Sequence, residues 1–181
     1  KPLYNIAAMT TVQPGSTFKM ITGLAALENG LDPYYQILDK GVIEMGGRTF
    51  GCWIWNERGG NHGYENLMDA LRDSCNYYFY SVSVGYNYAT DTPLPVKMKA
   101  EDVLTYSKLF GLDQKTGIQI EEIAGKVPNP ASKAQGLSYR LESDLNRRMR
   151  TYFNDFDSKD PKYEEAINKI VSWMDENPTR G

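Results

Sequence analysis

Apolar residues recur at helical spacing in the first part of the chain. In residues 16–28 they fall at Phe18, Ile21, Leu24 and Leu27, which lie on one face of a helix with 3.6 residues per turn. A Pro-Gly pair precedes this stripe and an Asn-Gly pair follows it. Because such pairs mark helix boundaries, the pattern predicts a helix over residues 16–28.

The middle of the chain predicts a hairpin followed by shorter helices. Residues 41–55 place β-prone side chains on both sides of a Gly-Gly pair, which is typical of a tight β-turn. The elements predicted after it are a polar loop (57–63), a brief helix that ends near Ser74, a buried aromatic helix (77–84), an amphipathic helix (100–110) and an extended segment (116–122). Ser74 is therefore expected at a junction between two helices.

The end of the chain has a different character. Residues 141–156 and 161–174 are charged and amphipathic, and a polar segment separates them. This pattern predicts a pair of helices with solvated outer faces.

Composition narrows the classes of function. The chain has 181 residues, 41% of them hydrophobic, and can bury one sizeable core. Its formal net charge of −3, with acids and bases intermixed, offers no surface for nucleic acid, and no apolar run reaches the roughly 18 residues of a membrane span. Cys52 and Cys75 are too few for a disulfide scaffold, and a single histidine, His62, gives them too few partners for a metal site. We therefore expect two buried thiols, no metal and no cofactor.

Ser16 and Lys19 are the first candidates for chemistry. Lys19 lies one helical turn after Ser16, so its amine can reach the serine oxygen and place a base beside a nucleophile. To accept a proton near neutral pH, the lysine needs a pKa well below its usual value, which burial or a neighbouring positive group would produce. Taken alone the spacing is common, and a helix-capping Ser16 beside a solvated Lys19 explains it as well.

Ser74 and Asn76 add a hydroxyl and an amide two positions apart at the predicted junction. Such a pair can relay a proton and orient an amide substrate. A serine that caps a helix and an asparagine in a turn would explain the same sequence. Ser-x-x-Lys followed by Ser-x-Asn nevertheless belongs to one known set of motifs, which Lys-Thr-Gly completes.

With these motifs the chain resembles the transpeptidase domain of penicillin-binding proteins. The resemblance extends over residues 2–128 and rests on segments 2–5, 13–19, 24–30, 52–53, 62–63 and 70–79. It implies the helical lobe of the α/β penicillin-binding transpeptidase or β-lactamase-like fold: mainly α, with a short β-hairpin, and with the central sheet largely absent from this fragment. It also implies two parts, residues 1–138 from the transpeptidase domain and residues 139–181 as a charged helical insertion or extension.

The resemblance further implies an activity. A D,D-transpeptidase of this kind cross-links peptidoglycan at the extracytoplasmic face of the bacterial membrane, with its anchor outside this fragment. Ser16 would be acylated by a D-Ala-D-Ala stem peptide or by a β-lactam, Lys19 would be the base, Ser74 would pass a proton to the leaving group, and Asn76 would hold the substrate amide. Other cell-wall synthesis proteins are implied as partners, and His62 is expected to structure a loop.

Lys115-Thr116-Gly117 has the same sequence as the third motif, but its neighbouring residues differ from those expected around that motif. It runs into Ile118, as in a structural Gly-x-x-Thr-Gly-Ile segment of the same family, so we interpret it as structural. The functional Lys-Thr-Gly is expected on a sheet strand that lies outside this fragment. The isolated chain is therefore expected to be inactive.

Two other functions stay open on the sequence alone. A serine β-lactamase or β-lactam sensor shares the Ser-x-x-Lys helix, but its class usually carries an apolar residue where Asn76 stands. A non-catalytic lobe that binds another cell-wall protein is the alternative from outside enzymology.

Overall fold

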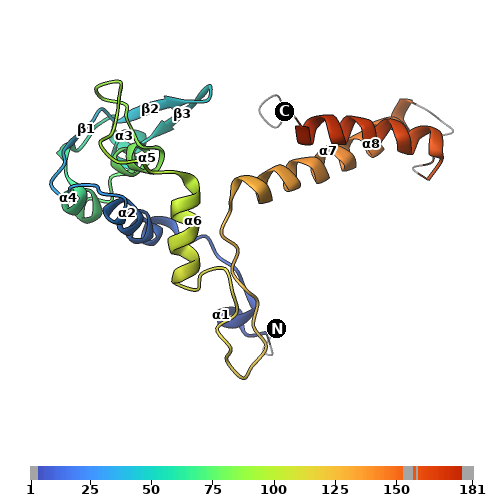
Figure 1. Ribbon diagram of the computed structural model, residues 1–181, viewed down its shortest axis with the longest axis horizontal. Helices are drawn as coiled ribbons and strands as arrows, with labels where there is room; N and C mark the ends of the chain where they lie inside the picture. Colours follow the sequence, from blue (N-terminus) through green and yellow to red (C-terminus); the bar gives the residue numbers. More distant parts are fainter. Residues whose placement is uncertain (1–3, 153–156, 158, 177–181) are drawn as a thin grey trace. The chain divides into compact units, whose positions relative to one another are not determined.

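The computed structural model describes residues 4–152, 157 and 159–176. Its contacts divide the chain into two compact units, Lys1–Val127 and Pro128–Gly181, and each is described by itself (Figure 1). Within the described residues, no helix combines the length and the apolar character that crossing a membrane requires.

The helices of the first unit lie mainly where the sequence predicts them. They are α1 (Ile6–Met9), the 3-10 turn η1 (Gly15–Phe18), α2 (Lys19–Glu28), α3 (Trp53–Arg58), α4 (Leu67–Arg72), α5 (Asn76–Val84) and α6 (Ala100–Leu109). The predictions that correspond to α2, α4, α5 and α6 are confirmed, and η1 supplies the first turn of the predicted helix over residues 16–28. Helices α1 and α3 were not predicted, because helices of 4 and 6 residues carry too little periodicity to be recognised.

The strands of the first unit form three small antiparallel pairs. They are β1 (Ile37–Asp39) with β4 (Gly63–Glu65), β2 (Val42–Met45) with β3 (Arg48–Gly51), and β5 (Tyr86–Asn87) with β6 (Thr92–Pro93). The β2–β3 pair confirms the predicted hairpin, and its Gly46-Gly47 turn has positive φ at both residues, as a tight hairpin turn requires. The end of the predicted hairpin segment is instead α3, which Gly59 closes in a left-handed conformation.

Helix α2 packs against α4, α5 and α6 to form the core of the first unit. Ala25 and Ala26 of α2 are fully buried, and a Cβ added to Gly23 would lie 3.2 Å from the Leu67 side chain, so small residues allow the helices to approach closely. Tyr77 and Tyr78 of α5 are also buried, as the sequence predicts for this aromatic segment. Burying each such side chain contributes on the order of 2 kcal/mol to the free energy of folding. The core therefore fixes α2 and α5, the two elements that carry the candidate motifs.

The Lys115-Thr116-Gly117 segment lies in a loop and not on a strand. The Glu122 carboxylate closes this loop by accepting hydrogen bonds from Thr116 Oγ1 and from the backbone N–H of Gly117, each at 2.8 Å. Gly117 has a φ of +82°, which favours glycine. These contacts give the segment a local structural role, in agreement with the sequence interpretation.

The second unit contains two helices in contact, α7 (Pro130–Tyr152) and α8 (Pro161–Glu176). Helix α7 begins eleven residues before the predicted start at residue 141, because Asn129 and Pro130 form an N-terminal cap that the prediction overlooked. The Asn129 side chain accepts the Ser132 backbone N–H at 2.9 Å. Residues 153–156 of the predicted pair lie outside the described residues, and the origin of residues 139–181 as an insertion or extension stays a prediction.

Gly41, which follows β1, provides a test of this packing. Its φ is +88° and an added Cβ would lie 2.3 Å from the Trp55 ring, whereas Gly46 has a φ of +58° and open space around it. We expect Gly41→Ala to lower the free energy of unfolding by about 3 kcal/mol, because steric overlap adds to backbone strain. Gly46→Ala should cost only about 1 kcal/mol. Urea denaturation of the protein that carries this domain measures both, and equal losses would contradict the packing around Gly41.

Candidate active site

The four residues selected from the sequence, Ser16, Lys19, Ser74 and Asn76, come together in the structure. Ser16 lies in η1 and Lys19 begins α2, while Ser74 lies between α4 and α5 and Asn76 begins α5. The Ser74 hydroxyl donates a hydrogen bond to Ser16 Oγ at 2.9 Å, and Lys19 Nζ lies 3.0 Å from Ser74 Oγ. Lys19 and Ser16 are thus linked through Ser74, and the hydrogen bonds of the described residues include none that joins them directly.

Lys19 is held by acceptors from the junction. Besides Ser74 Oγ, its Nζ donates to the Ser74 backbone carbonyl and to Asn76 Oδ1, each at 2.6 Å. These three contacts use the full donor capacity of an ammonium group. Burial lowers the pKa of Lys19, against the opposing effect of the nearby Cys52 and Cys75 thiols. At a given pH the neutral form of the amine is therefore more populated here than in a free lysine.

Ser74 has an unusual backbone conformation. Its φ of +52° lies in the left-handed region, which costs a residue with a Cβ about 1 kcal/mol. Helix α4 ends at Arg72, and the backbone carbonyl of its C-cap residue Asp73 accepts the Trp53 indole N–H at 3.0 Å. Cys75 caps α5. The two helix ends therefore hold Ser74 in the strained conformation that directs its hydroxyl to Ser16.

A second cluster, Asp39, Cys52, His62 and Cys75, lies next to this junction. One potential ligand atom from each side chain lies within 4.8 Å of all the others. The Asp39 Oδ2 atom is 2.8 Å from His62 Nδ1 and accepts the Cys75 thiol at 3.4 Å, and Cys52 Sγ is 3.5 Å from His62 Nδ1. We call these four side chains the thiol cluster.

The thiol cluster has the ligand types and spacing of a zinc site. Zinc binds sulfur at about 2.3 Å and nitrogen or oxygen at about 2.0 Å, so neighbouring ligands in a tetrahedron lie about 3.5 Å apart. The contacts of Asp39 with Cys75 and of Cys52 with His62 already have this separation. Two thiols, an imidazole and a carboxylate suit zinc better than magnesium or calcium.

Electrostatics in the thiol cluster act in different directions on its members, and only the shift at Cys52 favours a deprotonated metal ligand. The neighbouring Cys75 side chain, together with the Tyr77 and Asn76 backbone N–H groups, lowers the pKa of Cys52 to about 6 although burial opposes this. The neighbouring Cys52 side chain and burial raise the pKa of Cys75. Burial lowers the pKa of His62, but the hydrogen bond with Asp39 and the nearby charges of Cys52, Asp39 and Glu65 together raise it by more. A thiolate is therefore available at Cys52 before any metal binds.

The thiol cluster and the Ser74 junction share residues. Cys75 lies between Ser74 and Asn76, and Cys52 Sγ accepts the Asn76 backbone N–H at 3.2 Å. Cys75 Sγ also accepts the backbone N–H of Tyr78 and so caps α5. Any change at the two sulfurs will therefore act on the position of Asn76.

Comparison with known proteins decides the family. The family described as "Penicillin binding protein transpeptidase domain" matches residues 1–174. This chain belongs to that penicillin-binding transpeptidase family. The match confirms the sequence resemblance and continues past residue 128, where the resemblance ended.

Curated relatives of this transpeptidase-family chain are long proteins. It is 35% identical to stage V sporulation protein D of Bacillus subtilis over 122 residues, which are 65% of this chain and 16% of that protein. It is 31% identical to the peptidoglycan D,D-transpeptidase MrdA of Acinetobacter baumannii over 135 residues, 74% of this chain and 18% of that protein. The chain thus spans less than a fifth of the length of these relatives.

Solved structures show the same fold. The penicillin-binding protein PBP2 of Helicobacter pylori superimposes with a TM-score of 0.61 at 29% identity, over 74% of this chain and 23% of that one. PBP2 of Pseudomonas aeruginosa also gives a TM-score of 0.61, over 75% of this chain and 28% of that one, at 23% identity, a level that speaks for the fold alone. The helical fold with small sheets is therefore the penicillin-binding transpeptidase fold.

Sequence reasoning missed the thiol cluster of this transpeptidase-family chain. The expectation of buried cysteines is confirmed, but the reasoning that they lack partners for a metal was wrong. The partners come together because β1 and β4 pair, which brings Asp39 opposite Gly63, next to His62. Strands of three residues give no usable alternation, so the only available signal was the number of Cys, His and Asp residues near the Ser-x-Asn motif.

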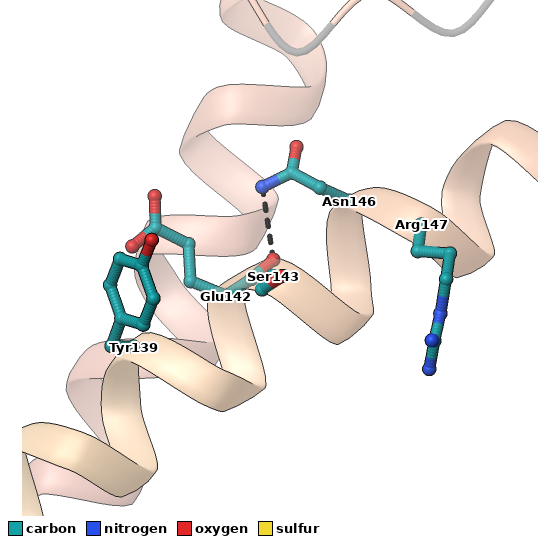
Figure 2. A pocket seen from close by; sticks show the side chains of 5 residues that line it. All are labelled: Tyr139, Glu142, Ser143, Asn146 and Arg147. Carbon is teal, nitrogen blue, oxygen red and sulfur yellow. Dashed lines mark hydrogen bonds between the residues drawn. The ribbon is translucent and has the colours of Figure 1, made fainter. Parts of the chain in front are cut away.

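Figure 2 shows a hollow on the second unit, lined by Tyr139, Glu142, Ser143, Asn146 and Arg147. All of these side chains project from successive turns of α7, and the Asn146 amide donates to the Glu142 backbone carbonyl at 2.9 Å. None of the residues selected from the sequence lies there. The hollow therefore offers no counterpart to the arrangement around Ser16.

The strain at Ser74 can be measured by two substitutions that both remove the hydroxyl. Ser74→Gly should leave the protein about 0.5 to 1 kcal/mol more stable to urea than Ser74→Ala, because glycine accepts the positive φ. Ser83, inside α5, is the matched control, where glycine should be about 1 kcal/mol less stable than alanine. The same order at both positions would contradict a strained Ser74.

Proposed function

We propose that this chain carries the nucleophile of a serine D,D-transpeptidase that cross-links peptidoglycan stem peptides. The observation that supports this most directly is the hydrogen-bonded series from Lys19 through Ser74 to Ser16, with Asn76 beside it. Membership in the penicillin-binding transpeptidase family and relatives named D,D-transpeptidases support the same reaction class.

The geometry suggests how acylation proceeds. Ser16 Oγ attacks the carbonyl carbon of the penultimate D-Ala, and its proton moves to Ser74 while Ser74 passes its own to neutral Lys19. Ser74 then returns a proton from Lys19 to the departing D-Ala amine as the peptide bond breaks. Asn76 orients the substrate amide, and the amine of a second stem peptide displaces Ser16 from the ester. A β-lactam enters the same first step through its strained amide.

Lys19 has two states in this scheme. The protonated amine makes the three hydrogen bonds that hold the junction together, and the neutral amine accepts the proton of the nucleophile. Burial, which lowers its pKa, brings these states closer in free energy. The role of base for Lys19 depends on this balance.

Two other functions are weaker proposals. A serine β-lactamase or β-lactam sensor would share Ser16 and Lys19, but it gives no reason for Asn76 to bind Lys19 at 2.6 Å. A non-catalytic lobe that binds another cell-wall protein gives no reason for a strained Ser74 aimed at Ser16. The transpeptidase accounts for both features.

We also propose the setting in which the parent protein works. The substrate places it at the extracytoplasmic face of the bacterial membrane, held by an anchor outside this chain. One solved relative is a complex between PBP2 and MreC from Helicobacter pylori, and another is a peptidoglycan synthase complex. Cell-wall synthesis proteins are accordingly our proposed partners, beside the stem peptide and β-lactams.

The thiol cluster supports a second proposed function, a structural zinc site. Its ligands come from the end of β1, the start of α3, the segment before β4 and the start of α5. A zinc ion would fasten these elements together behind the Ser74 junction, and its binding energy would add to the stability of the fold. It would take no part in the acylation steps.

Replacing Ser16 tests the main proposal. Ser16→Ala in the parent protein should abolish covalent labelling by fluorescent penicillin, because the hydroxyl linked to Lys19 is removed. Ser83→Ala, which removes a hydroxyl bonded only to its own helix, should keep full labelling. Persistent labelling of Ser16→Ala at another serine would refute the assignment.

The isolated chain tests the proposal that the central sheet and its Lys-Thr-Gly strand lie outside it. One oxyanion donor would be the Ser16 backbone N–H and the other would come from that strand, and losing one donor costs about 100- to 1000-fold in rate. We expect the chain to be acylated that much more slowly than the parent protein, as mass spectrometry can follow. Acylation at the parent rate would show that the chain holds a complete site.

Metal analysis tests the zinc site. The parent protein dialysed against zinc and then against buffer should retain one zinc per thiol cluster, and chelation should lower its melting temperature. Asp39→Asn should lose the zinc, whereas Glu44→Gln, an exposed carboxylate on β2, should keep it. Stoichiometric zinc in Asp39→Asn, or none in the unmodified protein, would contradict the site.

A further inference from the structure

Two buried polar atoms at the thiol cluster have no hydrogen-bond partner among the described residues. They are Nε2 of His62 and Oε2 of Glu65. The His62 side chain is 8% exposed and Glu65 is 2% exposed, so bulk solvent does not reach these two atoms. An unpaired polar atom in the interior is destabilising, and native proteins keep few of them.

His62 and Glu65 lie in the same buried neighbourhood. His62 directly precedes β4, and Glu65 ends that strand opposite Ile37 of β1. Against the effect of burial, the charge of Glu65 helps to raise the pKa of His62. Burial and Asp73 raise the pKa of Glu65 to about 7, and His62 opposes this shift. The carboxyl group and the imidazole thus act on each other.

The other charged neighbours of Glu65 offer no donor to its Oε2 atom. Asp73 shares a hydrogen bond with Glu65, yet Oε2 still has no partner among the described residues. Of the described groups that act on the pKa of Glu65, Arg72 and His62 carry positive charge. The Arg72 guanidinium is exposed and already donates to Asp69 at 2.8 Å and to Asp73 at 2.7 Å. The imidazole of His62 is therefore the donor that remains for Oε2.

The two ring nitrogens of His62 have different surroundings. Nδ1 faces the thiol cluster, since it lies 2.8 Å from Asp39 Oδ2 and 3.5 Å from Cys52 Sγ. It is therefore the nitrogen that a zinc ion at the cluster would bind. Zinc needs the lone pair of Nδ1, so the proton of the neutral ring then sits on Nε2. Metal binding thus turns the unpaired Nε2 atom into an N–H donor.

We propose that Glu65 is a positioning residue for the thiol cluster, whose Oε2 accepts the Nε2–H of His62 when zinc binds at Nδ1. This role rests on the zinc site proposed above and adds a residue on which the affinity of that site depends. A carboxylate that accepts the second N–H of a metal-bound imidazole fixes the orientation of the ring and makes it a stronger ligand. The charge of the zinc ion in turn favours the ionised form of Glu65.

The zinc affinity of the parent protein, measured by competition with a chelator of known affinity, tests this role. Glu65→Leu should weaken zinc binding by about 10- to 100-fold, because the imidazole N–H loses its acceptor. Glu65→Gln keeps a neutral acceptor and should weaken zinc binding by about threefold to tenfold. Glu44→Leu, at an exposed position on β2, is the matched control and should bind zinc as the unmodified protein does.

Thermal unfolding separates this role from a purely structural one. Without zinc, Glu65→Leu should melt at the same temperature as the unmodified protein or higher, because the substitution removes a buried polar atom that lacks a partner. Zinc should then raise the melting temperature of Glu65→Leu by less than that of the unmodified protein. A purely structural residue would lower the melting temperature equally with and without zinc, and that result would overturn the proposal.

The zinc measurements distinguish a failure of this role from a failure of the zinc site. Equal zinc affinity in Glu65→Leu and the unmodified protein overturns the role of Glu65 and leaves the zinc site in place. An unmodified protein that binds no zinc overturns both. Should Glu65→Leu fail to fold, Glu65→Gln decides the question, and a zinc affinity within roughly twofold of that of the unmodified protein then overturns the role.

Discussion

The candidate site depends on the partial burial of one amine, that of Lys19, against the junction of α4 and α5. Its Nζ donates hydrogen bonds to the backbone carbonyl and the hydroxyl of Ser74 and to the side-chain oxygen of Asn76. Taking the amine out of water lowers its pKa, and the same contacts hold Ser74 against Ser16. Close packing of the α2 alanines fixes the helix backbone from which this amine extends.

The junction in turn depends on its contacts with the thiol cluster. Cys75 sits inside the Ser-x-Asn motif, caps α5 and contacts Asp39, and Cys52 accepts the Asn76 N–H. The proposed zinc would bind to this same support. The candidate active site on one side of Cys75 and the thiol cluster on the other are thus joined through a single turn of backbone.

Much of this arrangement could be predicted from the sequence, for physical reasons. The stripe of apolar residues in α2 and the aromatic run of α5 are long enough to show their period, and the Ser16 to Asn76 motifs identified the family and the residues that meet. The thiol cluster could not be predicted, because it depends on the short β1–β4 pair that joins Asp39 to His62 across the chain. The proton-relay role of Ser74 was predicted, but its left-handed backbone conformation was not, since the positive φ of a serine leaves no mark in the sequence.

The pH dependence of acylation tests the central claim that the partly buried Lys19 is the base for Ser16. The second-order rate constant for β-lactam acylation of the parent protein should rise with pH through a single ionisation below the ordinary lysine pKa of about 10.4, since the amine must be neutral to act. In Lys19→Met this ionisation should vanish and the rate should fall by about 1000-fold or more. A rate constant that does not change with pH over this range would contradict the account. So would a Lys19→Met variant whose acylation rate constant lies within a few fold of that of the unmodified protein.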